Sequence, residues 1–113
     1  MRLDAWTERL DGTHFVVAEG EVDLADAHKL SRALSEVLAA REGDVVVDLC
    51  AVRFMDSFGI GKLLDALQQL RRQGRRMAVV CPPGAVRRVL ELARLEEILR
   101  VHETREEARA ALA

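Results

Sequence analysis

A short apolar run, followed closely by a long amphipathic segment, limits this chain to folds that pair a buried strand with a packed helix. The apolar run is Val45–Leu49, and the segment from Ser57 to about Gln73 has apolar side chains at helical spacing. These apolar positions are Ile60, Leu63, Leu64, Leu67 and Leu70. A continuous apolar run is typical of a strand that is covered on both faces of its sheet. The sequence therefore predicts an α/β fold with a mostly parallel sheet.

The rest of the chain continues this alternation of strands and helices. The chain should begin with a hairpin, whose first strand covers 6–10 and whose second strand starts at Phe15 and ends at Gly20–Asp23. A helix should follow from Asp23 or Asp26 to about Arg41. Further strands are expected at 45–49, 77–81 and 98–101, and further helices at 57–73, 85–93 and 104–112. We expect residues 1–113 to form one domain with a mixed sheet of four to five strands. The helices should lie mainly on one side of this sheet, with Val45–Leu49 and Met77–Val80 as its buried middle.

Composition excludes several classes of function. The net charge of −2 gives no sign of a nucleic-acid-binding domain, and no apolar run approaches the ~18 residues of a membrane span. The start of the chain lacks the apolar core of a signal peptide, so we expect a cytoplasmic protein. Cys50 and Cys81 are expected to be buried, reduced residues, and the three histidines lack ligand spacing. We therefore expect no metal and no cofactor, and a small-molecule ligand is not indicated.

The stretch from Phe54 to Gly61 is the most informative candidate site. Ser57 is interpreted as a helix N-cap at the carboxyl end of a strand, where backbone N–H groups and the helix dipole favour a phosphate. The simpler interpretation is a plain N-cap, worth ~1 kcal/mol to the helix. Gly59 and Gly61 do not form a phosphate-binding loop, because the Lys-Ser/Thr pair of that motif does not follow.

Two motifs in this order resemble the STAS domain family. They are Gly20-Glu21-Val22-Asp23 and Phe54-Met55-Asp56-Ser57-Phe58-Gly59-Ile60-Gly61. The break at Pro82-Pro83, followed by Val86–Leu92, also fits the third helix of that family. The resemblance covers nearly the whole chain and is strongest to bacterial anti-sigma factor antagonists.

The resemblance implies a phosphorylation switch in a binding protein that is not an enzyme. Family members bind an anti-sigma factor that is also a serine kinase of the GHKL type, and so release the sigma factor. The kinase phosphorylates the serine after the aspartate, here Ser57, which blocks binding, and a serine phosphatase restores it. The resemblance places the partner-binding surface at Asp23, Asp56, Ser57, Phe58, Gly59 and Ile60.

The chain departs from the family pattern at Phe58, where Ser or Thr is usual. We expect this side chain to face solvent or the partner, because other residues already supply the core face of the helix. An alternative from another class is a cytoplasmic STAS accessory subunit of a lipid-transport ABC complex. A phosphoacceptor role for Asp56, as in response regulators, is disfavoured because the acidic pair and late lysine of such sites are missing.

Overall fold

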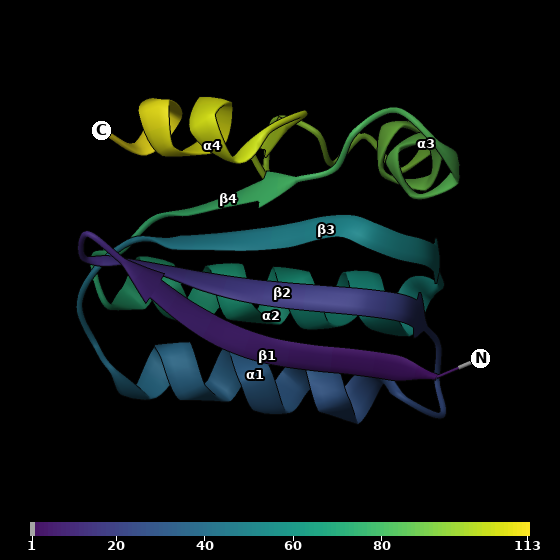
Figure 1. The fold of residues 1–113 in the computed structure, drawn as a ribbon, viewed down its shortest axis with the longest axis horizontal. Helices are drawn as coiled ribbons and strands as arrows, with labels where there is room; N and C mark the ends of the chain where they lie inside the picture. The colour runs from purple at the N-terminus through teal and green to yellow at the C-terminus, as the bar shows by residue number, and fades with distance from the viewer. Residues whose placement is uncertain (1) are drawn as a thin grey trace.

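The computed structural model describes residues 2–113, which form five strands and four helices (Figure 1). In chain order they are β1 (Leu3–Leu10), β2 (Thr13–Val22), α1 (Ala27–Ala39), β3 (Val45–Met55), α2 (Ser57–Arg72), β4 (Met77–Val80), α3 (Ala85–Leu92), β5 (Val101–His102) and α4 (Arg105–Leu112). The predicted order of elements is confirmed. Thr104 and Glu107 form a capping box at the start of α4, and Gly74, just after α2, has a positive φ of +70°.

The strands form one mixed sheet in the order β1-β2-β3-β4-β5. The β1–β2 hairpin is antiparallel, and the other three strand pairs are parallel. Because neighbouring parallel strands follow each other along the chain, right-handed crossovers place each connecting helix on the same face. The prediction that the helices lie mainly on one side of the sheet is confirmed, and this topology explains the arrangement.

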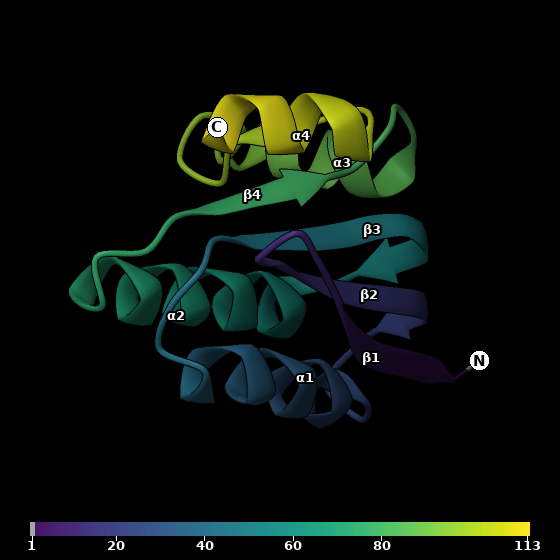
Figure 2. The same ribbon diagram turned by 60° about the vertical axis from the view of Figure 1, so that its left-hand side comes forward.

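Two apolar layers sandwich the sheet. The larger layer lies between the sheet and helices α1, α2 and α3, and the smaller one lies under α4 on the opposite face. The smaller layer contains Phe15, Val17, Val46, Ala78, Val80, Ala108 and Leu112. In both ribbon views α1 and α2 lie side by side, whereas α4 lies near β4 (Figures 1 and 2). The predicted buried middle, Val45–Leu49 and Met77–Val80, is confirmed.

Three strand predictions need correction. β1 begins at Leu3 and not at residue 6, since Leu3 already pairs with Gly20 of β2. β3 does not end at Leu49 but continues to Met55, because β2 remains paired with it as far as Val22. The last strand is not 98–101 but only Val101–His102. Residues 95–100 instead form turns, in which Leu99 N–H donates to Leu95 C=O and Val101 N–H donates to Glu96 C=O.

A partly buried ion pair fastens α4 to the sheet. Arg105 Nε donates to Asp48 Oδ2 at 2.7 Å, and the guanidinium carbon lies 4.7 Å from the centre of the Phe15 ring. Asp48 Oδ1 also accepts the N–H of Cys50 at 2.9 Å. Burial raises the pKa of Asp48, but the hydrogen bonds from Cys50 and Arg105 outweigh this effect and hold it below its usual value.

We expect Asp48→Asn to lower the free energy of unfolding by roughly 1 kcal/mol at pH 7, because a charge-assisted hydrogen bond becomes a neutral one. The folded-state pKa of Asp48 is depressed, so the stabilisation is complete above the ordinary pKa of ~3.9 and is lost as the pH falls through the folded-state pKa. Urea unfolding at pH 7 and pH 3 should show the difference between wild type and variant shrinking at acidic pH. An unchanged difference at pH 3 would contradict this role for the ion pair.

Candidate functional site

Ser57 occupies the first turn of α2, directly beyond the carboxyl end of β3. Its side chain is exposed, as the phosphorylation hypothesis requires. The interpretation of Ser57 as the N-cap is wrong, however, since Asp56 takes that position with extended backbone angles. Ser57 is therefore the first helical residue, and its hydroxyl is not needed to cap the helix.

Asp56 fixes the geometry of the site through its backbone contacts. Its Oδ1 accepts the N–H groups of Phe58 at 3.0 Å and Gly59 at 3.2 Å. Its Oδ2 accepts the N–H of Leu24 at 3.1 Å, across from the loop that follows β2. One carboxylate thus caps α2 and ties the β2–α1 loop to it. This bonding supports a structural role for Asp56 in preference to a phosphoacceptor role.

Asp23 and Asp56 lie at neighbouring strand ends. Val22 and Met55 are register partners in the parallel β2–β3 pair, and each aspartate directly follows one of them. The Asp56 N–H also donates to Val22 C=O at 3.0 Å. Asp23 Oδ1 accepts the N–H of Asp26 at 3.0 Å and so shapes the turn before α1. The structure therefore brings together two acidic residues that are 33 positions apart in the sequence.

Gly59 and Ile60 lie mainly on the packed side of α2 and not on its exposed surface. Gly59 is buried, and a Cβ atom there would lie 2.7 Å from Val22 Cγ1 and 2.8 Å from Met55 Cγ. Ile60 is half-buried and packs against the main core. Both residues are predicted to contact the partner, and this close packing limits what Gly59 in particular can offer directly.

Two large apolar side chains are exposed beside Ser57. Phe58 is 49% exposed, in agreement with the prediction that it faces outward. Leu24 is 65% exposed in the turn before α1, and it is absent from the residues predicted for this site. The sequence does contain an indication that Leu24 is exposed. It directly follows Asp23 and lies outside the apolar periodicity of the following helix. A third apolar side chain, Phe54 on β3, is 48% exposed at the start of the motif that contains Ser57. The exposed parts of the site thus include a hydroxyl and apolar side chains.

The Gly20 of the first motif has a structural explanation. Its φ is +116°, a conformation that side chains disfavour, and a Cβ atom there would lie 2.0 Å from the carbonyl oxygen of Arg2. Gly20 pairs with Leu3 in the β1–β2 ladder. The glycine therefore allows close approach of β1 near the end of β2 that presents Asp23.

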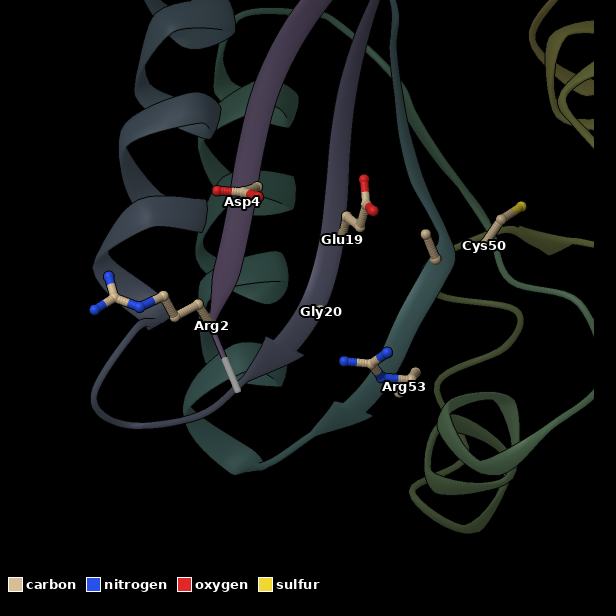
Figure 3. A pocket seen from close by; sticks show the side chains of 7 residues that line it. Arg2, Asp4, Glu19, Gly20, Cys50 and Arg53 are labelled. Carbon is tan, nitrogen blue, oxygen red and sulfur yellow. The ribbon is translucent and has the colours of Figure 1, made fainter.

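A separate depression of about 630 Å³ lies on the part of the sheet that α4 leaves open (Figure 3). It is lined by Arg2, Asp4, Glu19, Gly20, Cys50, Ala51 and Arg53, and none of the predicted partner-binding residues is among them. Its side chains come from β1, β2 and β3 and from the residue before β1, and they carry both signs of charge. This mixture does not select a ligand of one charge.

Cys50 corrects the prediction that both cysteines are buried. Cys81 is buried, but Cys50 is exposed in the middle of β3. Its side chain points to the face away from the main core, beyond the area that α4 covers. Partial burial of the sulfur in this otherwise exposed residue, and then its hydrogen bond with Asp48, raise the pKa of Cys50 to about 11.

We expect the Cys50 thiol to react slowly with iodoacetamide, because the thiolate is the reactive form and the raised pKa keeps the thiol protonated. A pKa of about 11 instead of 9 lowers the thiolate fraction at pH 8 by about 100-fold. Asp48→Asn should speed the alkylation, since it removes the neighbouring negative charge. Mass spectrometry of timed samples gives the rate, with Cys50→Ser as the control for labelling at Cys81. A rate equal to that of free cysteine would contradict the raised pKa.

Neither a metal site nor a membrane-spanning helix is found in residues 2–113. In that range, no three His, Cys, Asp or Glu side chains are grouped so as to hold a metal ion. No helix among those described is long and apolar enough to cross a membrane.

The fold is a single α/β domain with a mixed five-stranded sheet, and its candidate site carries an exposed serine directly after Asp56. Comparison with known proteins shows the family to which the chain belongs. Residues 5–108 match the STAS domain. The chain belongs to the STAS domain family. The resemblance drawn from its two motifs is therefore confirmed.

Several similar proteins carry the name of anti-sigma factor antagonist. The chain is 35% identical over 89 residues to the anti-sigma-F factor antagonist RsfB of Mycobacterium tuberculosis, covering 79% of this chain and 72% of that protein. It is 30% identical over 103 residues to the anti-sigma-B factor antagonist of Listeria monocytogenes, covering 89% and 90%. The crystal structure of an anti-sigma factor antagonist from Mycobacterium paratuberculosis superposes with a TM-score of 0.90 at 29% identity, covering 97% and 93%.

Proposed function

We propose that this protein is an anti-sigma factor antagonist whose binding is switched off by phosphorylation of Ser57. The observation that carries the proposal is the exposed serine at the start of α2, held beside Asp56 where β2 and β3 end together. Its relatives named as antagonists match over most of both chains, which supports the same role here.

In the unphosphorylated state, the partner surface would pack over the Ser57 hydroxyl. Phosphorylation adds about −1.5 to −2 charges and three acceptor oxygens. The N–H groups of Phe58 and Gly59 already bond to Asp56, so the phosphate would meet a carboxylate and not a set of free donors. The phosphate leaves the fold intact on the exposed surface, but a dianion buried without a partner in the interface costs far more than the interface gains.

The proposal includes two protein partners. One is an anti-sigma factor that is also a GHKL-type serine kinase, and the other is a serine phosphatase that restores the hydroxyl. In this scheme the chain is a binding protein and a kinase substrate, not an enzyme. It would act in the cytoplasm.

A pull-down from the native cell extract tests the proposal. Tagged wild type and Ser57→Asp are compared, with mass spectrometry of the captured proteins and of phosphorylated sites. We expect wild type to capture a GHKL-type kinase that Ser57→Asp does not retain, and phosphate to appear at Ser57. Capture of an ABC-transporter ATPase by both proteins would favour the transport-subunit alternative. Phosphate at Ser31 or Ser35, with Ser57 unmodified, would refute the switch.

A further inference from the structure

We propose that Leu24 and Phe58 form a two-point apolar contact that determines which anti-sigma factor this protein binds. This inference rests on the proposed function and concerns the chemistry of its partner. The partner would present an apolar surface that receives both side chains on either side of Ser57. Leu24 comes from the β2–α1 loop and Phe58 from α2, so the contact spans two elements.

Both side chains are exposed, and the backbone at each position is fixed by a hydrogen bond. Leu24 is 65% and Phe58 49% exposed, although each is a large apolar side chain. The backbone N–H of Leu24 donates to Asp56 Oδ2, and that of Phe58 donates to Asp56 Oδ1. One carboxylate thus fixes the two backbone positions next to each other. A partner that binds this pair does not have to order a mobile segment, which favours affinity.

The neighbouring carboxylates already accept hydrogen bonds from backbone N–H groups of this chain. Both Asp56 oxygens accept backbone N–H groups, and Asp23 Oδ1 is bonded to the N–H of Asp26. Gly59 is buried. We therefore expect apolar burial at Leu24 and Phe58 to contribute strongly to binding at this surface, in line with the dominance of a few large side chains in interfaces.

Other exposed apolar side chains lie on different elements. Trp6 and Leu10 belong to β1, Phe54 to β3, Leu92 to the last turn of α3, and Ile98 to the turns before β5. Leu92 is 74% exposed, more than Leu24, and provides a matched control. If general surface hydrophobicity were responsible for binding, Leu92 would matter as much as Leu24.

The test measures binding of the purified anti-sigma factor, captured as described above, to the full chain by titration calorimetry. We expect Leu24→Ser and Phe58→Ser each to weaken binding about tenfold or more. Leu24→Met should retain affinity, and Leu92→Ser should bind like wild type. One apolar surface of the partner is proposed to receive both side chains, so the two substitutions should not act independently. The affinity of the double variant Leu24→Ser/Phe58→Ser should therefore fall by a smaller factor than the product of the two single factors. The melting temperatures should remain within about 3 °C of wild type, since both side chains lie on the surface.

The outcomes separate this inference from the proposed function. If wild type binds no anti-sigma factor, the proposed function fails and the inference with it. If wild type binds and Leu24→Ser retains its affinity, the two-point contact is wrong while the antagonist role stands. The inference is also overturned if Leu24→Ser loses binding because it unfolds, which a large fall in its melting temperature would show, and Leu24→Met binds the anti-sigma factor as weakly as Leu24→Ser.

Discussion

Ser57→Asp is expected to weaken binding to the anti-sigma factor by at least about 1–2 kcal/mol, because it places a carboxylate in a contact that excludes water. The side chain at position 57 is exposed, so it accepts the charge without disturbing the core. Asp56 lies directly next to it and gives no compensating positive charge. Phosphoserine at the same position carries more charge than aspartate, and its effect on affinity should be larger.

The matched control is Ser35→Asp, which adds the same charge at an exposed position of α1. It should bind like wild type, and neither aspartate variant should change the free energy of unfolding by more than about 0.5 kcal/mol. Ser57→Ala should bind normally but resist release when ATP is added to the kinase complex. Calorimetry for affinity and urea unfolding for stability separate these effects. Equal binding by Ser57→Asp and wild type would contradict the switch.

Much of this fold follows from patterns that are local in the sequence. The apolar run at Val45–Leu49 predicts a doubly covered strand, and the spacing of Leu63, Leu67 and Leu70 predicts the buried face of α2, as observed. The capping box at Thr104 needs only two side chains three positions apart. These features could be predicted because they depend on short-range geometry.

The errors arose where distant residues decide the outcome. β3 continues to Met55 because β2 supplies a neighbouring strand that far, and nothing within 50–55 itself indicates this. Cys50 is exposed because α4 covers only part of the second face of the sheet. Its partner Asp48 is held by Arg105, 57 positions away, which no local pattern indicates.

The candidate site shows the same division between local and distant information. Ser57 and Phe58 were found from their motif, and their exposure agrees with the expectation. Asp56, and not Ser57, is the N-cap because the extended backbone angles occur at Asp56. Either residue type is favourable at an N-cap, so the sequence alone does not distinguish the two positions. Leu24 joins the site only through the bond of its N–H to Asp56, across the gap between two strand ends.

The two glycines of the second motif should respond in opposite ways to alanine. Gly59→Ala is expected to lower the free energy of unfolding by about 1–3 kcal/mol, since the added methyl group overpacks the contact with Val22 and Met55. Met55 has flexibility to adjust, but the Val22 Cγ1 atom, 2.7 Å from the new Cβ, belongs to a stiff, fully buried side chain. A methyl group added at Gly61 would point into open space, with no packed neighbour within 4 Å, so Gly61→Ala should stabilise α2 by roughly 0.5–1 kcal/mol.

Urea unfolding of the two variants beside wild type measures this difference directly. Because both glycines lie in the same helix and gain the same methyl group, helix propensity favours alanine equally at each position. The difference between the variants therefore reports the close contact at Gly59 alone. If Gly59→Ala proved as stable as Gly61→Ala, α2 would not be packed against Val22 and Met55 as the structure shows. The position of Ser57 beside the end of β2 depends on that packing, so the same measurement tests the geometry on which the proposed switch is built.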